Sequence, residues 1–354
     1  MSWEANVRTV IPYVPGEQPK RKDIIKLNTN ECPYAPAPGI KKALEAYEID
    51  ALRLYPDPNT ADLVNALADT YKVDSENVFV GVGSDDVLAM AFLTFFNSGK
   101  KILFPDITYS FYDVWADLYR IPYEMQPLDE DFCIRKEDYF KDNGGIIFPN
   151  PNAPTGVDMP LSDIEEIIAK NPDVVVIVDE AYVDFGCKSA LPLIEKYDNV
   201  LVVQTFSKSR ALAGIRIGYA FGSKKLIKYL NDVKFSFNSY TMNRLTTVVG
   251  CACLEDKSYF EECVLKVIST RERSKQRLAE LGFSFGDSKA NFIFASHKSV
   301  SAKDIFEALK EAGIYVRYWN KPRINNHLRI SIGTDEEMDT MLDFLEKYLQ
   351  KCEE

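Results

Sequence analysis

The chain has 354 residues, of which 46% are hydrophobic and 27% are charged, and this composition is typical of a globular protein with a sizeable core. Its formal net charge of −11 disfavours nucleic-acid binding, because phosphate neutralisation needs a concentrated surface of Lys and Arg. The longest apolar runs have the length of strands and the first residues carry no secretion signal, so we expect neither a membrane span nor export.

The cysteines and histidines disfavour a metal centre. Seven cysteines, an odd number at irregular spacing, suit reduced thiols in the cytoplasm better than a disulfide framework. With only His297 and His327 in the chain, a zinc site or a Ser-His-Asp triad has little support. We therefore expect a cytoplasmic protein without a metal site.

The first 38 residues are rich in proline and predict an extended arm that lies over other structure. A disordered tail is the alternative, but apolar residues in this stretch, including Tyr13, favour docking. Near its end, the polar run from 26 to 31 is turn-forming and includes Asn30.

A helix at 60–71 and a strand at 78–80 come next, and the strand runs into a glycine-rich turn at 81–86 and a second helix to residue 96. A strand, a glycine turn and a helix start together expose backbone N–H groups and the positive end of a helix dipole. Ser84 and Asp85 are therefore candidates for a phosphate site, although a tight turn without any ligand would use the same glycines.

Strands and helices then alternate as far as residue 222. This rhythm predicts an α/β large domain whose mostly parallel sheet is flanked by helices, with ligands beyond the carboxyl ends of the strands. We expect strands at 101–104, 145–148, 174–178 and 200–203, and helices at 108–119 and 161–170. The residues at or just after the strand ends include Tyr109, Asn152, Asp179, Tyr182 and Lys208.

Beyond residue 222 longer helices and shorter strands predict a smaller α+β domain. The expected helices are 224–234, 243–254, 258–281, 302–312 and 335–349, and the expected strands are 290–295, 315–318 and 328–332. We divide the chain into an N-terminal arm (1–38), a large domain (39–245) and a small C-terminal domain (246–354). No stretch has the composition of a flexible linker, so a long helix is the expected bridge.

Lys208 is the centre of the predicted chemistry. It follows the apolar run 200–203, and an ammonium near apolar walls and other cations loses solvation, so that its free amine can form a Schiff base. Asp179 ends a β-branched run and needs a cationic partner, such as a protonated pyridine nitrogen. Tyr182 offers a phenol to a phenolate oxygen. Each residue alone also fits an ordinary structural role.

Candidates for binding a phosphate and for stacking on a ring lie in the same part of the sequence pattern as this amine, carboxyl and phenol. Ser207 and Arg216, with the N–H groups around Ser84 and Asp85, could bind a phosphate, and Tyr109 could stack on a ring. Amine, carboxylate, phenol, phosphate clamp and aromatic ring together are the complement of pyridoxal 5'-phosphate.

The sequence also resembles a known family. The segments 150–156 and 179–182, and Ser207-Lys208 with Arg216, resemble the signatures of the fold-type-I, class I and II aminotransferases. Four further segments resemble the histidinol-phosphate aminotransferases within that group: 27–31, 54–57, 211–216 and 328–334.

The resemblance implies roles for individual residues. Lys208 would bond covalently to the cofactor, Asp179 would contact its pyridine nitrogen, and Tyr182 its ring oxygen. Ser207 and Arg216 would bind its phosphate, and Tyr55 would reach the phosphate of the neighbouring subunit, which implies a homodimer. The family usually has Asn where this chain has Ala153, and Asn152 is the nearest candidate to take over its contact with the ring oxygen.

The resemblance further implies transamination of L-histidinol phosphate with 2-oxoglutarate in histidine biosynthesis, with Lys208 as the base. The expected substrate-binding residues are Tyr13, Asn30, Arg317 and Arg329. An aromatic amino-acid aminotransferase or an amino-acid-phosphate decarboxylase of the same fold remains an alternative. A non-enzymatic regulator would need a DNA-binding module, and none is visible.

Overall fold

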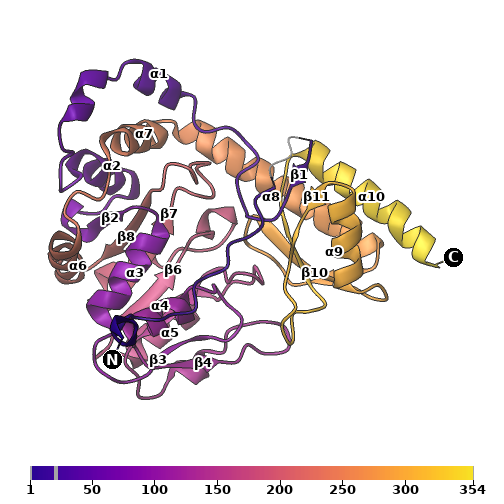
Figure 1. Ribbon diagram of the computed structural model, residues 1–354, viewed down its shortest axis with the longest axis horizontal. Helices are drawn as coiled ribbons and strands as arrows, with labels where there is room; N and C mark the ends of the chain where they lie inside the picture. The colour runs from indigo at the N-terminus through magenta and orange to yellow at the C-terminus, as the bar shows by residue number, and fades with distance from the viewer. Residues whose placement is uncertain (1, 20–22, 354) are drawn as a thin grey trace.

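The computed structural model describes residues 2–19 and 23–353, and its large domain is built on one seven-stranded sheet (Figure 1). The strand order is β2-β8-β7-β6-β5-β3-β4, and β8 runs antiparallel to both of its neighbours while the other pairs are parallel. The strands are β2 (Val78–Gly81), β3 (Ile102–Pro105), β4 (Tyr123–Gln126), β5 (Ile146–Pro149), β6 (Val176–Asp179), β7 (Val200–Thr205) and β8 (Gly218–Gly222).

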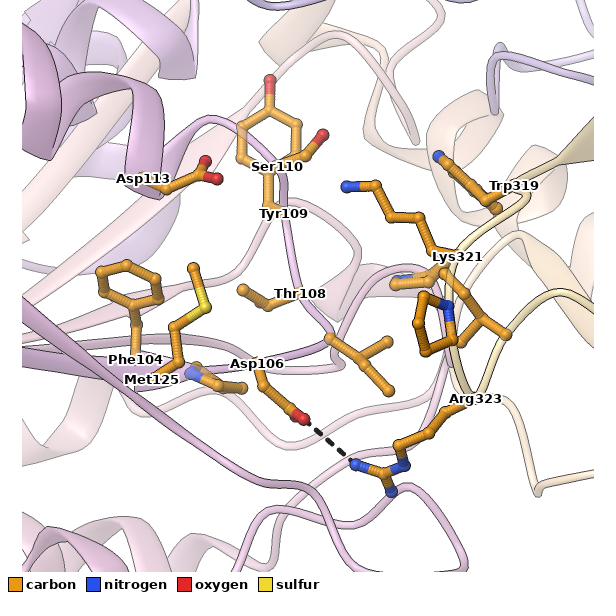
Figure 2. A pocket seen from close by; sticks show the side chains of 15 residues that line it. Phe104, Asp106, Thr108, Tyr109, Ser110, Asp113, Met125, Trp319, Lys321 and Arg323 are labelled. Carbon is orange, nitrogen blue, oxygen red and sulfur yellow. Dashed lines mark hydrogen bonds and ion pairs between the residues drawn. The ribbon is translucent and has the colours of Figure 1, made fainter.

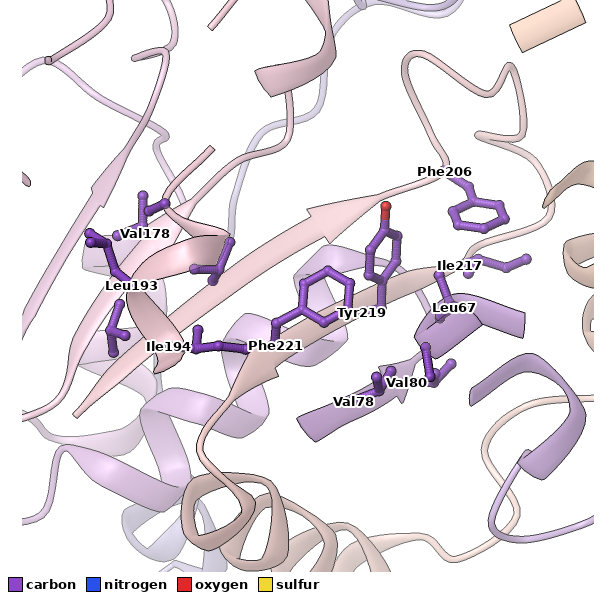
Figure 3. Packing of buried hydrophobic residues seen from close by; sticks show 14 of the residues in the cluster. Leu67, Val78, Val80, Val178, Leu193, Ile194, Phe206, Ile217, Tyr219 and Phe221 are labelled. Atoms are coloured by element: carbon purple, nitrogen blue, oxygen red, sulfur yellow. The ribbon is translucent and has the colours of Figure 1, made fainter. Parts of the chain in front are cut away.

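The sheet is covered on both faces, because its central strands β6 and β7 are buried at every position and successive side chains point to opposite sides. Val178 and Val202 pack with one buried cluster, whereas Ile177 and Leu201 pack with another. Figure 3 shows the first cluster, in which Tyr219 contributes from β8. The helices of this part are α1 (Gly39–Glu45), α2 (Ala61–Tyr71), α3 (Ser84–Phe95), α4 (Tyr112–Tyr119), α5 (Leu161–Lys170), α6 (Lys224–Phe237) and α7 (Arg244–Glu255).

A second sheet carries the C-terminal part, with strand order β12-β13-β10-β9 and antiparallel pairing throughout. Its strands are β9 (Phe283–Phe285), β10 (Phe292–His297), β12 (Arg317–Tyr318) and β13 (Leu328–Ser331), and its helices are α8 (Lys257–Glu280), α9 (Ala302–Glu311) and α10 (Asp335–Glu353). In Figure 1, α8 extends from α7 beside the large sheet to the small sheet. No helix in the described part of the chain combines the length and the apolar character that crossing a membrane requires.

The N-terminal arm crosses between the two sheets (Figure 1). The ring of Tyr13 stacks on Phe111 at 4.1 Å between centroids, and Arg8 donates a hydrogen bond to the carbonyl of Leu118. Further along, β1 (Ile25–Lys26) pairs in parallel with β11 (Ile314–Tyr315). Short 3-10 helices complete the described structure at Trp3–Asn6, Ile49–Arg53, Ser75–Asn77, Lys136–Tyr139, Val183–Phe185 and Leu191–Glu195.

The α/β class with a mostly parallel sheet and a smaller α+β part is confirmed, and the differences from expectation are local. Strands β1, β4, β8 and β9 have no counterpart among the predicted strands, and helix α1 has none among the predicted helices. Helix α4 begins at Tyr112 rather than at residue 108. The buried side chains of α7, such as Val249, belong to the core of the large sheet. We therefore propose that the large domain ends near the start of α8 rather than at residue 245.

Replacing Leu201 with Ala is expected to lower the free energy of unfolding by about 2–5 kcal/mol. The substitution leaves a cavity in the buried cluster that Leu201 shares with Ile177 on one face of the large sheet. Leu201 is 0% exposed on β7. Urea unfolding followed by circular dichroism measures the change, and Leu265→Ala is the control because Leu265 is 65% exposed on α8. Equal losses in the two variants would contradict this account of the core.

Candidate active site

The carboxyl ends of β5, β6 and β7 meet at one edge of the large sheet, where they border a cavity of about 170 Å³. Most of the predicted cofactor-binding residues share this cavity, and Tyr55 and Asn152 are the exceptions. The lining residues are Thr29, Glu31, Ser84, Asp85, Tyr109, Pro149, Ala153, Asp179, Ala181, Tyr182, Ser207, Lys208, Ala213 and Arg216.

Lys208 lies on the loop that connects β7 to the antiparallel strand β8. The loop is closed by backbone hydrogen bonds from Phe206 N to Ile217 O and from Leu212 N to Phe206 O. The ammonium of Lys208 donates a hydrogen bond of 3.3 Å to the carbonyl of Thr29 in the arm and lies 5.6 Å from the centre of the Tyr182 ring. The amine is therefore held between the large domain and the arm.

Asp179 stands at the tip of β6 and is only 4% exposed. Burial raises the pKa of its carboxyl to about 6, although hydrogen bonds from the Tyr112 hydroxyl (2.8 Å) and from the Ala181 N–H (3.2 Å) favour the ionised form. Sequence reasoning missed Tyr112. Its role depends on Asp179, which is 67 residues away in the chain, so no local pattern marks it.

The opposite end of the cavity is suited to an anion. Helix α3 begins at Ser84, and the N–H groups of a first helical turn lack partners within the helix. Arg216 donates to the hydroxyl of Ser207 (3.3 Å) and forms an ion pair with Asp85 (3.1 Å). A Cβ on Gly83, whose φ is +89°, would come within 2.3 Å of the Arg216 guanidinium, so the close approach requires glycine here.

Tyr109 covers the same end of the cavity. Its hydroxyl donates a hydrogen bond of 2.7 Å to Asp85, and burial next to that carboxylate raises the pKa of the phenol well above its usual value. The Asp85 carboxylate is therefore shared between Tyr109 and Arg216.

Asn152 does not face the cavity. It is 1% exposed, its amide donates to the carbonyl of Ile107 (2.9 Å) and to the hydroxyl of Thr155 (3.1 Å), and its oxygen accepts from Thr108 (3.0 Å). The side chain thus stabilises its own loop, which corrects the expectation that Asn152 reaches a ring oxygen. The neighbouring Ala153 lines the cavity instead.

A second cavity of about 280 Å³ adjoins the first and is bordered by Lys208 and Tyr182 as well. Tyr13, Asn30, Arg317 and Arg329, the four predicted substrate-binding residues, all line it.

Arg329 is a partly buried cation of this cavity. It donates to the carbonyl of Asn28 (2.9 Å) and lies over the rings of Phe292 (5.4 Å) and Trp319 (5.2 Å). Its Nε is buried without a hydrogen-bond partner, and burial lowers the pKa of the guanidinium, with the charge of Arg317 acting in the same direction. A partly buried, incompletely paired guanidinium is suited to an anionic ligand.

A third cavity of about 330 Å³ lies beside these two and is shown in Figure 2. Tyr109 and Ser110 border it from the large domain, and Trp319, Lys321 and Arg323 border it from the small domain. The ion pair between Arg323 and Asp106, at 3.1 Å, joins the two sides.

Tyr55 lies away from all of these cavities. Its side chain is 78% exposed and its ring lies 4.8 Å from that of Tyr240, while Arg244 donates to its backbone carbonyl at 2.6 Å. Within one chain Tyr55 therefore has no contact with the residues around Lys208.

Comparisons with known proteins agree with this geometry. Residues 22–345 match the family described as aminotransferase class I and II. The chain is 52% identical to a histidinol-phosphate aminotransferase of Lactococcus lactis subsp. cremoris over 100% of this chain and 99% of that protein. A histidinol-phosphate aminotransferase of Brachyspira hyodysenteriae is also 52% identical, over 97% of each chain.

Solved structures support the same relationship. The histidinol-phosphate aminotransferase of Sinorhizobium meliloti in complex with pyridoxal-5'-phosphate superposes with a TM-score of 0.85 and 25% identity, over 93% of this chain and 91% of that one. The family match over most of the length and the full-length identity lead to one conclusion: the chain belongs to the class I and II aminotransferase family, in which it groups with the histidinol-phosphate aminotransferases.

Proposed function

We propose that this protein is a pyridoxal 5'-phosphate-dependent aminotransferase that transfers the amino group of L-histidinol phosphate to 2-oxoglutarate, giving imidazole-acetol phosphate and glutamate in histidine biosynthesis. The observation that carries the proposal is a single cavity in which Lys208, the buried Asp179 and the start of α3 face one another. The full-length similarity to histidinol-phosphate aminotransferases supports the choice of substrate.

The residues that line the cavity fit the cofactor group by group. Asp179 is a carboxyl whose pKa is raised by burial, and a protonated pyridine nitrogen would supply a cationic partner for its ionised form. The phosphate would bind at the start of α3 with Ser207 and Arg216, and Gly83 leaves room for the guanidinium. Tyr109 would stack on the ring. We accordingly assign these residues to the cofactor.

Lys208 carries the chemical step. When bound, the cofactor supplies an electron-withdrawing ring that takes up negative charge from the substrate Cα. The amine of Lys208 would hold the cofactor and, when free, would move the proton at the substrate Cα. Asp179 would keep the ring nitrogen protonated, and the Tyr112 hydroxyl and the Ala181 N–H orient its carboxylate.

The second cavity would hold the rest of the substrate. Arg317 and Arg329 would bind the phosphate of the donor and the carboxylates of 2-oxoglutarate, because a guanidinium fork can contact two oxygens at once. Tyr13 lies on the arm at the border of this cavity and would cover the bound substrate. Asn30 also borders it.

A single-turnover panel tests the substrate. L-Histidinol phosphate, L-phenylalanine, L-aspartate and L-threonine phosphate are mixed separately with the loaded protein, and the change in visible absorbance is followed. Histidinol phosphate is expected to react fastest, because its phosphate matches the two arginines and its imidazole suits the Trp319 wall. Reaction with phenylalanine but not with histidinol phosphate would favour an aromatic aminotransferase, and loss of CO2 from threonine phosphate would favour a decarboxylase.

We further propose a homodimer in which Tyr55 of one subunit reaches the cofactor phosphate of the other. The exposed ring of Tyr55 and the exposed apolar side chains of Leu52, Leu54 and Phe237 support an interface on this face. A cytoplasmic location is also proposed, since seven irregularly spaced cysteines are typical of reduced thiols.

Hybrid dimers test the contribution of Tyr55. Homodimers of Lys208→Ala and of Tyr55→Ala are both expected to be impaired, but a hybrid of the two contains one site with both residues intact, so it should recover about half of the wild-type activity. Differently tagged subunits, co-expressed and purified through both tags, provide the hybrid. A hybrid with no more than about half the activity of the Tyr55→Ala homodimer would show that Tyr55 does not act across an interface.

A further inference from the structure

Asn30 is held more firmly than its place in an arm would suggest. It is 1% exposed, its N–H donates to the hydroxyl of Ser331 on β13 at 2.9 Å, and its carbonyl accepts from the amide of Asn291 at 3.0 Å. Its side-chain oxygen accepts from the same Ser331 hydroxyl at 2.8 Å. The small domain therefore fixes both the backbone and the side chain of Asn30.

These contacts also fix which way the amide points. The Ser331 hydroxyl has one proton, and since it accepts from the Asn30 N–H, that proton is directed to the Asn30 Oδ1. The Nδ2 of Asn30 consequently faces the Tyr182 hydroxyl at 2.9 Å and donates to it. Because the Asn30 Nδ2 only donates, it does not use the proton of the Tyr182 hydroxyl. That proton remains available to an acceptor in the cavity.

We propose that Asn30 is a positioning residue that sets the Tyr182 hydroxyl as a hydrogen-bond donor to the ring oxygen of the cofactor. The inference rests on the proposed function and deepens it. Neither Asn152 nor Ala153 can donate a hydrogen bond to the ring oxygen. Ala153 lines the cavity but has no polar side-chain atom, and the amide of Asn152 is hydrogen-bonded within its own loop. The donor at the ring oxygen is then Tyr182, oriented by the arm and β13.

The backbone at Asn30 indicates the best substitutions. Its φ is +56°, in the left-handed region that Asn, Asp and Gly adopt more easily than other residues. Asn30→Asp keeps the shape and the acceptor for Ser331, but it replaces the donor facing Tyr182 with an acceptor. The Tyr182 proton should then turn toward the new carboxylate. Asn30→Gly removes the side chain without straining the backbone.

The test is a pH titration of the visible absorbance of the cofactor-loaded protein. A hydrogen-bond donor at the ring oxygen of the cofactor withdraws negative charge from that oxygen. This negative charge would otherwise hold the proton on the Lys208 nitrogen that is bonded to the cofactor. Loss of the donor should therefore raise the midpoint of the titration, by about 1 pH unit in Asn30→Asp, since one unit corresponds to roughly the strength of one hydrogen bond. Asn30→Gly should raise it less, because nothing then competes for the Tyr182 proton.

A double-mutant cycle with Tyr182→Phe separates this role from the added charge of the aspartate. In the Tyr182→Phe background the shift caused by Asn30→Asp should be much smaller, and Asn97→Asp, which adds a charge beyond the far end of α3, should leave the midpoint unchanged. Equal shifts in the two backgrounds, or no shift in Asn30→Asp and Asn30→Gly, would overturn the role of Asn30. If the wild type itself forms no titrating chromophore, the proposed function fails instead. Should Asn30→Asp not fold, Asn30→Gly completes the same cycle.

Discussion

Replacing Lys208 with Ala is expected to lower the rate of amino transfer by about 10⁴-fold or more, because the variant loses the covalent anchor of the cofactor and the base that moves the substrate proton. The loop between β7 and β8 should keep its shape, since its closing hydrogen bonds are made by the backbone of Phe206, Leu212 and Ile217. Circular dichroism and urea unfolding should therefore resemble those of the wild type.

The covalent anchor is measured separately from the rate. Borohydride reduction of the loaded wild type should add the mass of the cofactor to the peptide that contains Lys208, whereas the Ala variant should show no such increase. Lys228→Ala is the matched control, because Lys228 is exposed on α6 and pairs with Asp232. A cofactor mass retained on Lys208→Ala would mean that another amine carries the cofactor.

Replacing Asp179 with Asn is expected to lower the turnover rate by about 10²- to 10⁴-fold, because removing one partner of a buried ion pair costs roughly 3–5 kcal/mol. The variant keeps the shape of the side chain, and its amide oxygen can still accept from Tyr112. Steady-state kinetics should place the loss in kcat rather than in KM, since Asp179 lines only the cofactor cavity. A loss confined to KM would contradict the assignment to the pyridine nitrogen.

The raised pKa of Asp179 also gives a stability that depends on pH. The carboxyl titrates near 3.8 in the unfolded chain and at about 6 in the folded one, so the folded state binds more protons between these values. The contribution is therefore fully present below the lower pKa and is lost as the pH rises through the higher one, by roughly 3 kcal/mol in total. Urea unfolding of the cofactor-free wild type should show this decline relative to Asp179→Asn, and bound cofactor should reduce it by supplying a cation.

Much of the architecture follows from local patterns. The apolar runs of β6 and β7 are strong signals, since every residue is buried from both sides, and the helical spacing of α2 and α5 is equally clear. Strand β8 was missed because its sequence, bracketed by Gly218 and Gly222, reads as a loop, and only its partners β2 and β7 make it a strand.

The candidate site divides in a similar way. The position of Lys208, Asp179 and Tyr182 around one cavity could be predicted, because unusual side chains follow strand ends and the topology brings strand ends together. Tyr112 and the orientations of Asn30 and Asn152 could not be predicted, because each depends on a hydrogen-bond partner at least 40 residues away in the chain or on the direction of one amide group. Tertiary contacts determine these side-chain orientations, so no periodic pattern in the sequence indicates them.

The antiparallel strand β8 restricts the movement of the loop that carries Lys208. A loop after a parallel strand normally leads to a helix on the outside of the sheet, but the loop of Lys208 returns at once into the sheet, where β8 pairs with both β7 and β2. Opening this loop would thus require breaking hydrogen bonds between β8 and its neighbours in the large sheet. If Lys208 holds the cofactor as proposed, its amine shares the rigidity of the sheet, and adjustment to different substrates would fall to the arm and to the small domain.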